Sequence, residues 1–201
     1  MSNIEENKER FIEVYKTNVT RAGSDKLLNF LMSENSDFFT APASTRYHCA
    51  YEGGLCDHSL HVYDCLKAYL ERNRVKDEYG LSYPEESIAV VALLHDICKV
   101  NLYRTSFRNK KNDATGVWEK VPYYEYHDTL PYGHGEKSVY IVSSYMRLTR
   151  EEAMAIRWHM GFSGEENVNT IGRALGMFPL ALAAHIADME ATFYIEGEED
   201  D

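Results

Sequence analysis

The sequence has few cysteines, and none of them has the paired spacing of a structural zinc site. Four occur among 201 residues, and no two are separated by just two residues. They lie in segments with helical patterns or motifs rather than in loops, at Cys49, Cys56, Cys65 and Cys98. We therefore predict small buried thiols, and neither a disulfide framework nor a zinc knot.

Long apolar runs are also absent. No run approaches the roughly 18 residues that cross a bilayer. The first residues, Met1 to Lys8, lack the basic-then-apolar order of a secretory signal. These absences predict a soluble protein of the cytoplasm.

Positive charge is scarce in this chain. It has 21 Lys and Arg against 32 Asp and Glu, a formal net charge of -11. This balance disfavours long nucleic acids, because such binding depends on basic side chains at the phosphates. A small phosphorylated substrate remains compatible, since a metal centre would supply positive charge locally. Part of the acidity is a terminal run over 196–201 that includes Glu196, which we predict to be a solvated, mobile tail.

Length and hydrophobic pattern predict one compact, mainly α-helical domain over residues 1–195. We expect N-terminal helices within 1–43 and a metal-site core over 44–193. A capping sequence at Ser82 predicts the start of a largely buried helix that runs to about Lys99. Apolar spacings of three and four, with the Gly53-Gly54 turn, predict the earlier helices over 4–19, 24–35 and 55–73.

The pattern changes between Leu102 and Tyr126, where stretches rich in β-branched and aromatic residues flank the turn-like segment 112–116. This pattern predicts a small exposed β-hairpin. Three further helices are predicted. One lies near 138–146, the second starts at the capping box of Thr149, and the third covers 178–195. A loop containing Gly161 is expected to precede the last helix.

The adjacent pair His95-Asp96 is the anchor of the predicted site. It closes the most apolar helix, so both side chains are expected to be partly buried, where an unpaired carboxylate is costly and a metal supplies the opposite charge. Imidazole and carboxylate together suit iron, manganese, zinc or cobalt better than calcium or magnesium. Lys99, three residues after Asp96, is placed to contact a substrate. Arg104 and Arg108 follow in the hairpin, where they either form a basic cluster that receives a phosphate or belong to a solvated surface strand.

The order of these residues resembles the HD-domain phosphohydrolase superfamily. The segment from Gly53 to Leu60 is similar to the Gly-Gly-Leu-Leu-x-His segment of bacterial HD proteins related to a 3'-to-5' exoribonuclease. The segment from Leu93 to Lys99 is similar to their Leu-Leu-His-Asp-Ile-Gly-Lys, except that Cys98 replaces the glycine. Later matches are Gly133-His134-Gly135-Glu136 and Trp158-His159-Met160. We expect no RNA-binding domain beside them, which weakens transfer of the exoribonuclease activity.

The resemblance implies an HD-type helical bundle and two divalent metals. One metal would be bound by His58, His95, Asp96 and Asp188, and His134 and His159 would complete the second site. Asp96 and Lys99 are the expected catalytic residues, and Lys99, Arg104 and Arg108 are the expected substrate-binding residues. His61 is predicted either to support a ligand or to have a structural role, and His185 to pack against or orient a neighbour. His48 and His127 are left outside the catalytic set.

These observations favour a metal-dependent phosphohydrolase. It would cleave a phosphoester or phosphoanhydride of a nucleotide or short oligonucleotide through metal-activated water. An HD-type di-iron oxygenase and a non-catalytic nucleotide-sensing module remain as alternatives, because the ligands alone do not separate them. The sequence leaves a homo-oligomer open.

Overall fold

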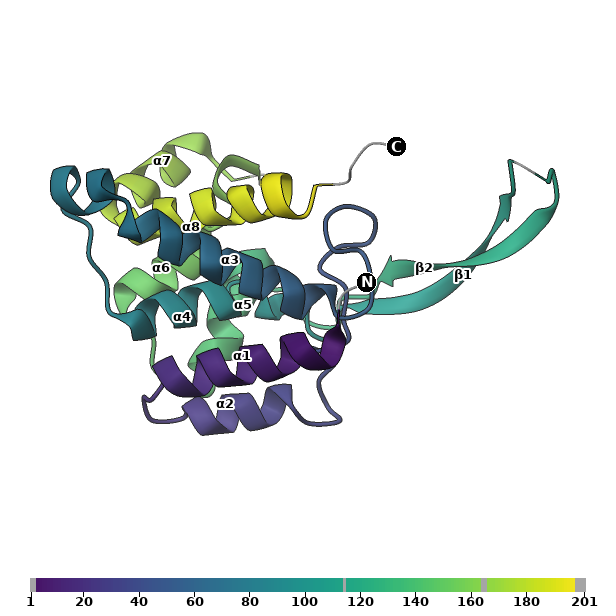
Figure 1. Cartoon of the computed structure of the whole chain (residues 1–201), viewed down its shortest axis with the longest axis horizontal. Coiled ribbons are helices and arrows are strands. Elements are labelled where there is room, and N and C mark those ends of the chain that lie inside the picture. The colour runs from purple at the N-terminus through teal and green to yellow at the C-terminus, as the bar shows by residue number, and fades with distance from the viewer. Residues whose placement is uncertain (1–2, 114, 164–165, 198–201) are drawn as a thin grey trace.

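The computed structural model describes residues 3–113, 115–163 and 166–197, and it shows a helical body with one projecting β-hairpin (Figure 1). The predicted fold class, mainly helical with a small hairpin, is confirmed. The helices are α1 (Ile4–Asn18), α2 (Ser24–Leu31), α3 (Gly54–Glu71), α4 (Glu85–Leu94), α5 (His134–Ser143), α6 (Arg150–Trp158), α7 (Val168–Met177) and α8 (Pro179–Glu190). The strands are β1 (Tyr103–Lys111) and β2 (Trp118–Tyr126).

The core lies around α4, which packs against α1, α3 and α6. Every residue of α4 from Ser87 to Leu94 is buried, so this helix is apolar on all sides and must be surrounded by other helices. On the other side of α3 lies α8, whose buried face is mostly alanine. These small side chains allow α8 to lie close to α3. Polar residues of α3 and α8 are therefore within reach of one another.

The helix α4 begins and ends differently from the prediction. Ser82 does not cap it; the N-cap residue is Pro84, whose carbonyl accepts from the backbone N–H groups of Ser87 and Ile88. The helix ends at Leu94, and a short 3-10 turn over Ile97–Lys99 replaces the predicted continuation. The helix end therefore falls at the His95-Asp96 pair, where a change of backbone direction can aim both side chains inward.

The second helix also stops earlier than predicted, at Leu31 rather than near Asn35. The Ser33 hydroxyl donates to the carbonyl of Phe30 and accepts from the N–H of Asn35. Such local bonds satisfy backbone groups without a helix, which explains the early end.

The hairpin pairs β1 with β2 in antiparallel register, from Tyr103 opposite Tyr126 to Lys111 opposite Trp118. Gly116, at φ +70°, closes the turn by donating from its N–H to the carbonyl of Asn112. Residue 114 of the predicted turn lies outside the described residues. The strands extend away from the helices in Figure 1, and the predicted exposed hairpin is confirmed.

One helix was missed, because the segment before Phe178 was predicted to be a loop. Asn167 caps α7 by accepting from the N–H groups of Asn169 and Thr170, and Ile171 and Leu175 form its buried face. The cap and the spacing of four were readable signals, but the glycines at 172 and 176 obscured them. The predicted capping box at Thr149 and the first-turn Pro179 of α8 are both confirmed.

Within the described ranges, no single helix has the length and apolar character to cross a membrane, although α7 and α8 with its extension meet that test as a bent pair.

Candidate metal centre

The six predicted metal ligands come together in the structure, although they are spread over 131 positions of the sequence from His58 to Asp188. They lie at or below the floor of one cavity of about 650 Å³. Each is carried by a different helix or helix end, except for the adjacent pair: His58 on α3, His95 and Asp96 after α4, His134 at the start of α5, His159 after α6, and Asp188 on α8. The predicted convergence of helix ends is therefore observed.

The first group of donors consists of His58, His95 and Asp188. The Nε2 atom of His58 lies 3.2 Å from the Nε2 atom of His95 and 3.3 Å from the Oδ1 atom of Asp188. Asp96 lies at its edge, because its Oδ2 atom is 3.6 Å from His58 Nε2 and 3.5 Å from His95 Nε2. Two imidazoles and a carboxylate at this spacing can hold a borderline divalent metal.

The second group faces the other oxygen of Asp96. Its Oδ1 atom lies 2.8 Å from His134 Nε2 and 3.5 Å from His159 Nε2, and these two nitrogens are 3.2 Å apart. Despite these distances, Oδ1 is buried without a well-formed hydrogen bond among the residues the structure describes. A buried carboxylate oxygen in this position is costly unless a cation compensates it. The donor set therefore fits a metal on each side of Asp96.

Main-chain carbonyls orient two of the imidazoles. The Nδ1 atom of His95 donates to the carbonyl of Ala92 at 2.8 Å, and that of His159 donates to the carbonyl of Ile156 at 2.7 Å. With the proton at Nδ1, the Nε2 lone pair is left for a metal. His185, which was predicted to pack against or orient a neighbour, donates from Nδ1 to the carbonyl of His159 at 2.7 Å.

Gly135 permits the close approach that forms the second group. A side chain there would collide with the main-chain carbonyl of Arg157 at the end of α6. Because the position is glycine, the start of α5 lies directly against the end of α6, and His134 reaches His159. The glycine of the Gly133–Glu136 motif thus has a packing role.

Charge and burial set the protonation of the centre. Burial alone would raise the pKa of Asp96, but Lys99, His95 and His134 outweigh it and hold the pKa well below its ordinary value. Lys99 contributes most, with its Nζ atom 2.6 Å from Asp96 Oδ2. Burial lowers the pKa of His95 to about 3, so its imidazole is neutral, as a metal ligand must be.

Cys98 lies beside the second group, with its Sγ atom 3.4 Å from His134 Nδ1. Burial raises the pKa of this thiol to about 12, which keeps it protonated. All four cysteines are buried and unpaired, which confirms the prediction of small buried thiols.

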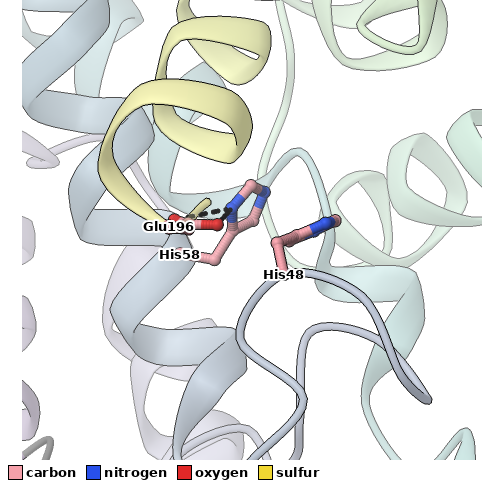
Figure 2. A group of neighbouring side chains, drawn as sticks. All are labelled: His48, His58 and Glu196. Carbon is pink, nitrogen blue, oxygen red and sulfur yellow. Dashed lines mark hydrogen bonds and ion pairs between the residues drawn. The ribbon is translucent and has the colours of Figure 1, made fainter. Parts of the chain in front are cut away.

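The prediction for Glu196 was wrong. Its side chain is not in a solvated tail but is 1% exposed, and its carboxylate lies 3.0 Å from His58 Nδ1 (Figure 2). The same carboxylate lies 2.8 Å from His61 Nδ1. A π-helical turn over Ala191–Ile195 carries the chain back to α3. Glu196 stands next to an acidic run in the sequence, and no local signal distinguished it from the residues of that run. Residues 198–201 of the predicted tail lie outside the described residues.

Lys137 and His48 line the cavity as well, although neither was in the predicted set. Lys137 is buried on α5 and donates to Asp128 at 2.7 Å. His48 lines the cavity with its ring 4.8 Å from the ring of His58, and its Nε2 atom is buried without a hydrogen-bond partner in the described part of the chain (Figure 2). His127 is half-buried and is not among the lining residues.

The two predicted arginines are not in the cavity. Arg104 and Arg108 are exposed on β1, and Arg108 stacks over the ring of Tyr123 at 5.5 Å. At the base of the hairpin, Tyr103 and Tyr126 do line the cavity. Lys99 is thus the one predicted substrate-binding residue that the structure places beside the metal ligands.

Comparison with known proteins relates a short segment of the chain to a phosphodiesterase. Over 60 residues it is 43% identical to the dihydroneopterin 2',3'-cyclic phosphate phosphodiesterase of Methanocaldococcus jannaschii. The match covers 29% of this chain and only 23% of that protein. No protein-family model matches the chain, and no solved structure matches it significantly.

Proposed function

We propose that this protein is a metal-dependent phosphohydrolase with an HD-type centre, which cleaves a phosphoester or phosphoanhydride of a nucleotide or short oligonucleotide. The observation that carries the proposal is the position of Asp96. Its two oxygens face two separate groups of donors, and the same carboxylate holds Lys99 at the cavity wall. A buried site with room for two cations and one further positive side chain suits a substrate that carries phosphate.

In this proposal the first metal is held by His58, His95, Asp96 and Asp188, and the second by Asp96, His134 and His159. Iron, manganese, zinc and cobalt suit this mixture of imidazole and carboxylate. When bound, such metals lower the pKa of water and polarise a phosphoryl oxygen. Asp96 is then the one residue shared by both sites.

The side chains of the cavity have separate tasks. Lys99 is nearly fully buried, so its ammonium is weakly screened and can offset charge that develops on the phosphoryl oxygens. Lys137 supplies a second ammonium in the wall, fixed by Asp128. The rings of Tyr103 and Tyr126 border the same cavity and can contact a base. A cavity of about 650 Å³ is within the size range of small-molecule sites.

The partial relative supports the reaction class. Its name specifies a phosphodiesterase that acts on dihydroneopterin 2',3'-cyclic phosphate. For this chain we propose phosphoester cleavage in a substrate of similar chemistry, a phosphorylated group beside a flat ring system. Arg104 and Arg108 lie outside the cavity, so we propose that they contact only a substrate long enough to extend along the hairpin.

The test combines metal content with product release. Protein purified without chelator is assayed for bound metal and for phosphate or nucleotide release from a panel of nucleotides, cyclic phosphates and short oligonucleotides. We expect about two metals per chain and release by the wild type, with both lost in Asp96→Ala. Asp64→Ala is the matched control, because Asp64 lies on α3 as an exposed partner of Arg10.

Oxygen consumption is measured in the same samples. Metal without release, together with oxygen uptake, would replace the hydrolase with the oxygenase alternative. Metal with neither release nor oxygen uptake would favour the sensing module. Absence of metal under several preparations would overturn the proposed centre altogether.

A further inference from the structure

The three buried histidines of the centre obtain their Nδ1 partners in two different ways. His95 and His159 follow the ends of α4 and α6, where the last carbonyls of each helix have no intrahelical partner and can accept from a side chain. His58 instead lies inside α3, between Gly54 and Glu71, where the helix uses its own carbonyls. An acceptor for His58 must therefore come from another part of the chain.

Glu196 is that acceptor. Its carboxylate oxygens lie 3.0 and 3.1 Å from His58 Nδ1, and one of them also lies 2.8 Å from His61 Nδ1. Figure 2 shows the Glu196 carboxylate against the His58 ring, joined by the dashed contacts. Both residues are almost completely buried, so the pair is shielded from the screening of water.

The C-terminal segment contacts His58 on both of its nitrogens. Asp188 on α8 lies 3.3 Å from Nε2, and Glu196, eight residues later, lies against Nδ1. The π-helical turn places Glu196 there, and the N–H of Glu196 donates to the carbonyl of the buried Ala191 at 2.9 Å. The position of the imidazole is thereby fixed by one continuous stretch of chain.

We infer that Glu196 is a positioning residue for the metal ligand His58, and that the C-terminal turn belongs to the functional site. A carboxylate at Nδ1 holds the proton on that nitrogen, orients the ring and makes Nε2 a stronger donor to a metal. The inference rests on the proposed metal centre. It assigns to residues 191–196 a role that a solvated tail could not have.

The experiment measures metal affinity of the full chain directly. Metal-free protein is titrated with Zn²⁺ in competition with a chelator of known affinity. We expect Glu196→Ala to bind the ion of the first site, which His58 helps to hold, about 10-fold to 100-fold less tightly, the usual effect of losing such a partner. Glu196→Gln should lose less, because its amide oxygen still accepts the bond without the charge.

Glu190→Gln is the matched control. Glu190 also joins α8 to α3, through Arg72 at 2.6 Å, but it touches no imidazole. It should leave zinc affinity unchanged even if it lowers the melting temperature. Thermal unfolding of each metal-free variant separates a loss of fold from a loss of binding. If Glu196→Ala does not fold, the test rests on Glu196→Gln, which creates no cavity.

A second readout reports the position of the proton. Nitrogen-detected NMR of the zinc-loaded protein should show a protected Nδ1–H on His58 in the wild type, absent or shifted in Glu196→Ala, while those of His95 and His159 persist. Unchanged zinc affinity and an unchanged His58 signal in both Glu196 variants would overturn the inference alone. A wild type that binds no zinc would overturn the proposed centre, and the inference with it.

Discussion

The proposed metal centre and the β-hairpin use the same kinds of polar residue under opposite conditions. In the centre, Asp96 and Lys99 are buried, and Asp96 lies against His134 and His159 from other parts of the chain. In the hairpin, the charged side chains are exposed and interact within the hairpin itself, as when Lys120 lies 5.2 Å from the ring centroid of Phe107. Asp96 and Lys99 come just before the hairpin in the sequence, since Lys99 ends the turn that leads into β1.

The difference teaches that burial, rather than residue type, decides how much a charge matters here. A buried charge that loses its partner keeps its full desolvation penalty, whereas an exposed one returns to water. Substitutions in the centre should therefore have large effects on binding and catalysis. Those on the hairpin should be nearly neutral for small substrates and for stability.

The largest effect is expected from Lys99→Ala. If the buried ammonium offsets charge on the phosphoryl group, kcat/KM should fall about 100-fold to 1,000-fold with metal content retained. Lys67→Ala is the control, because Lys67 forms an exposed ion pair with Glu85 at 3.2 Å. Steady-state kinetics with metal analysis checks both. Equal activities for the two variants would contradict the comparison, because burial would then make no difference to the contribution of a lysine to catalysis.

Metal removal should have the next largest effect. An ion that binds only the folded chain stabilises it by about 2.7 kcal/mol when present at 100 times its Kd. Chelator should lower the melting temperature accordingly, and added Zn²⁺ or Mn²⁺ should restore it. Replacing the hairpin, residues 103–126, by a short glycine linker should leave this shift intact, because none of the predicted ligands is on it. A shift that disappears with the hairpin would place the ion elsewhere.

A buried ion pair outside the centre allows the effect of burial to be tested at a position that binds no metal in the proposal. The Glu152 side chain is fully buried and contacts Arg21 at 2.6 and 2.7 Å, Ser87 at 2.7 Å and the N–H of Thr149. We expect Glu152→Gln to lower the free energy of unfolding by about 2 kcal/mol, the scale of a charged hydrogen bond lost in the interior. The exposed counterpart Glu85→Gln should change it by less than about 0.5 kcal/mol. Urea denaturation checks both values.

The same group predicts a pH dependence. Burial raises the pKa of Glu152, but Arg21, the Thr149 N–H and Ser87 outweigh it, so the pKa in the folded protein lies below the ordinary 4.5. The folded state therefore binds this proton more weakly than the unfolded state. Its stabilisation is complete above pH 4.5 and is lost as the pH falls through the lower folded value. Glu152→Gln should flatten this part of the stability curve, and an unchanged acid limb would contradict the assignment.

The smallest effects are expected on β1. Arg104→Ala and Arg108→Ala should change kcat/KM for a mononucleotide-sized substrate by less than about twofold, because exposed surface positions contribute little. A clear loss with an oligonucleotide alone would support their proposed contact with longer substrates. A large loss of kcat/KM with a mononucleotide would mean that these arginines contact the substrate in the cavity, and it would contradict the contrast between the two regions.

Much of this arrangement was predictable because it depends on local rules. The capping box at Thr149, the first-turn proline of α8 and the β-branched and aromatic stretches of the hairpin are readable within a few residues. The predicted ligands were likewise marked by residue type at helix ends. The end of α4 at Leu94 was less readable, because an apolar pattern continues past it and only the His95 side chain competes for the carbonyl of Ala92.

The sequence by itself determined the helical class, the hairpin and the order of histidines and aspartates that implies a metal centre. Only the tertiary structure decided which groups meet. Glu196 contacts His58 across 138 positions, and Arg104 is exposed outside the cavity although its neighbour Tyr103 lines it. The physical reason is that periodicity and capping report short-range energies, whereas the approach of helix ends depends on how whole faces pack against one another.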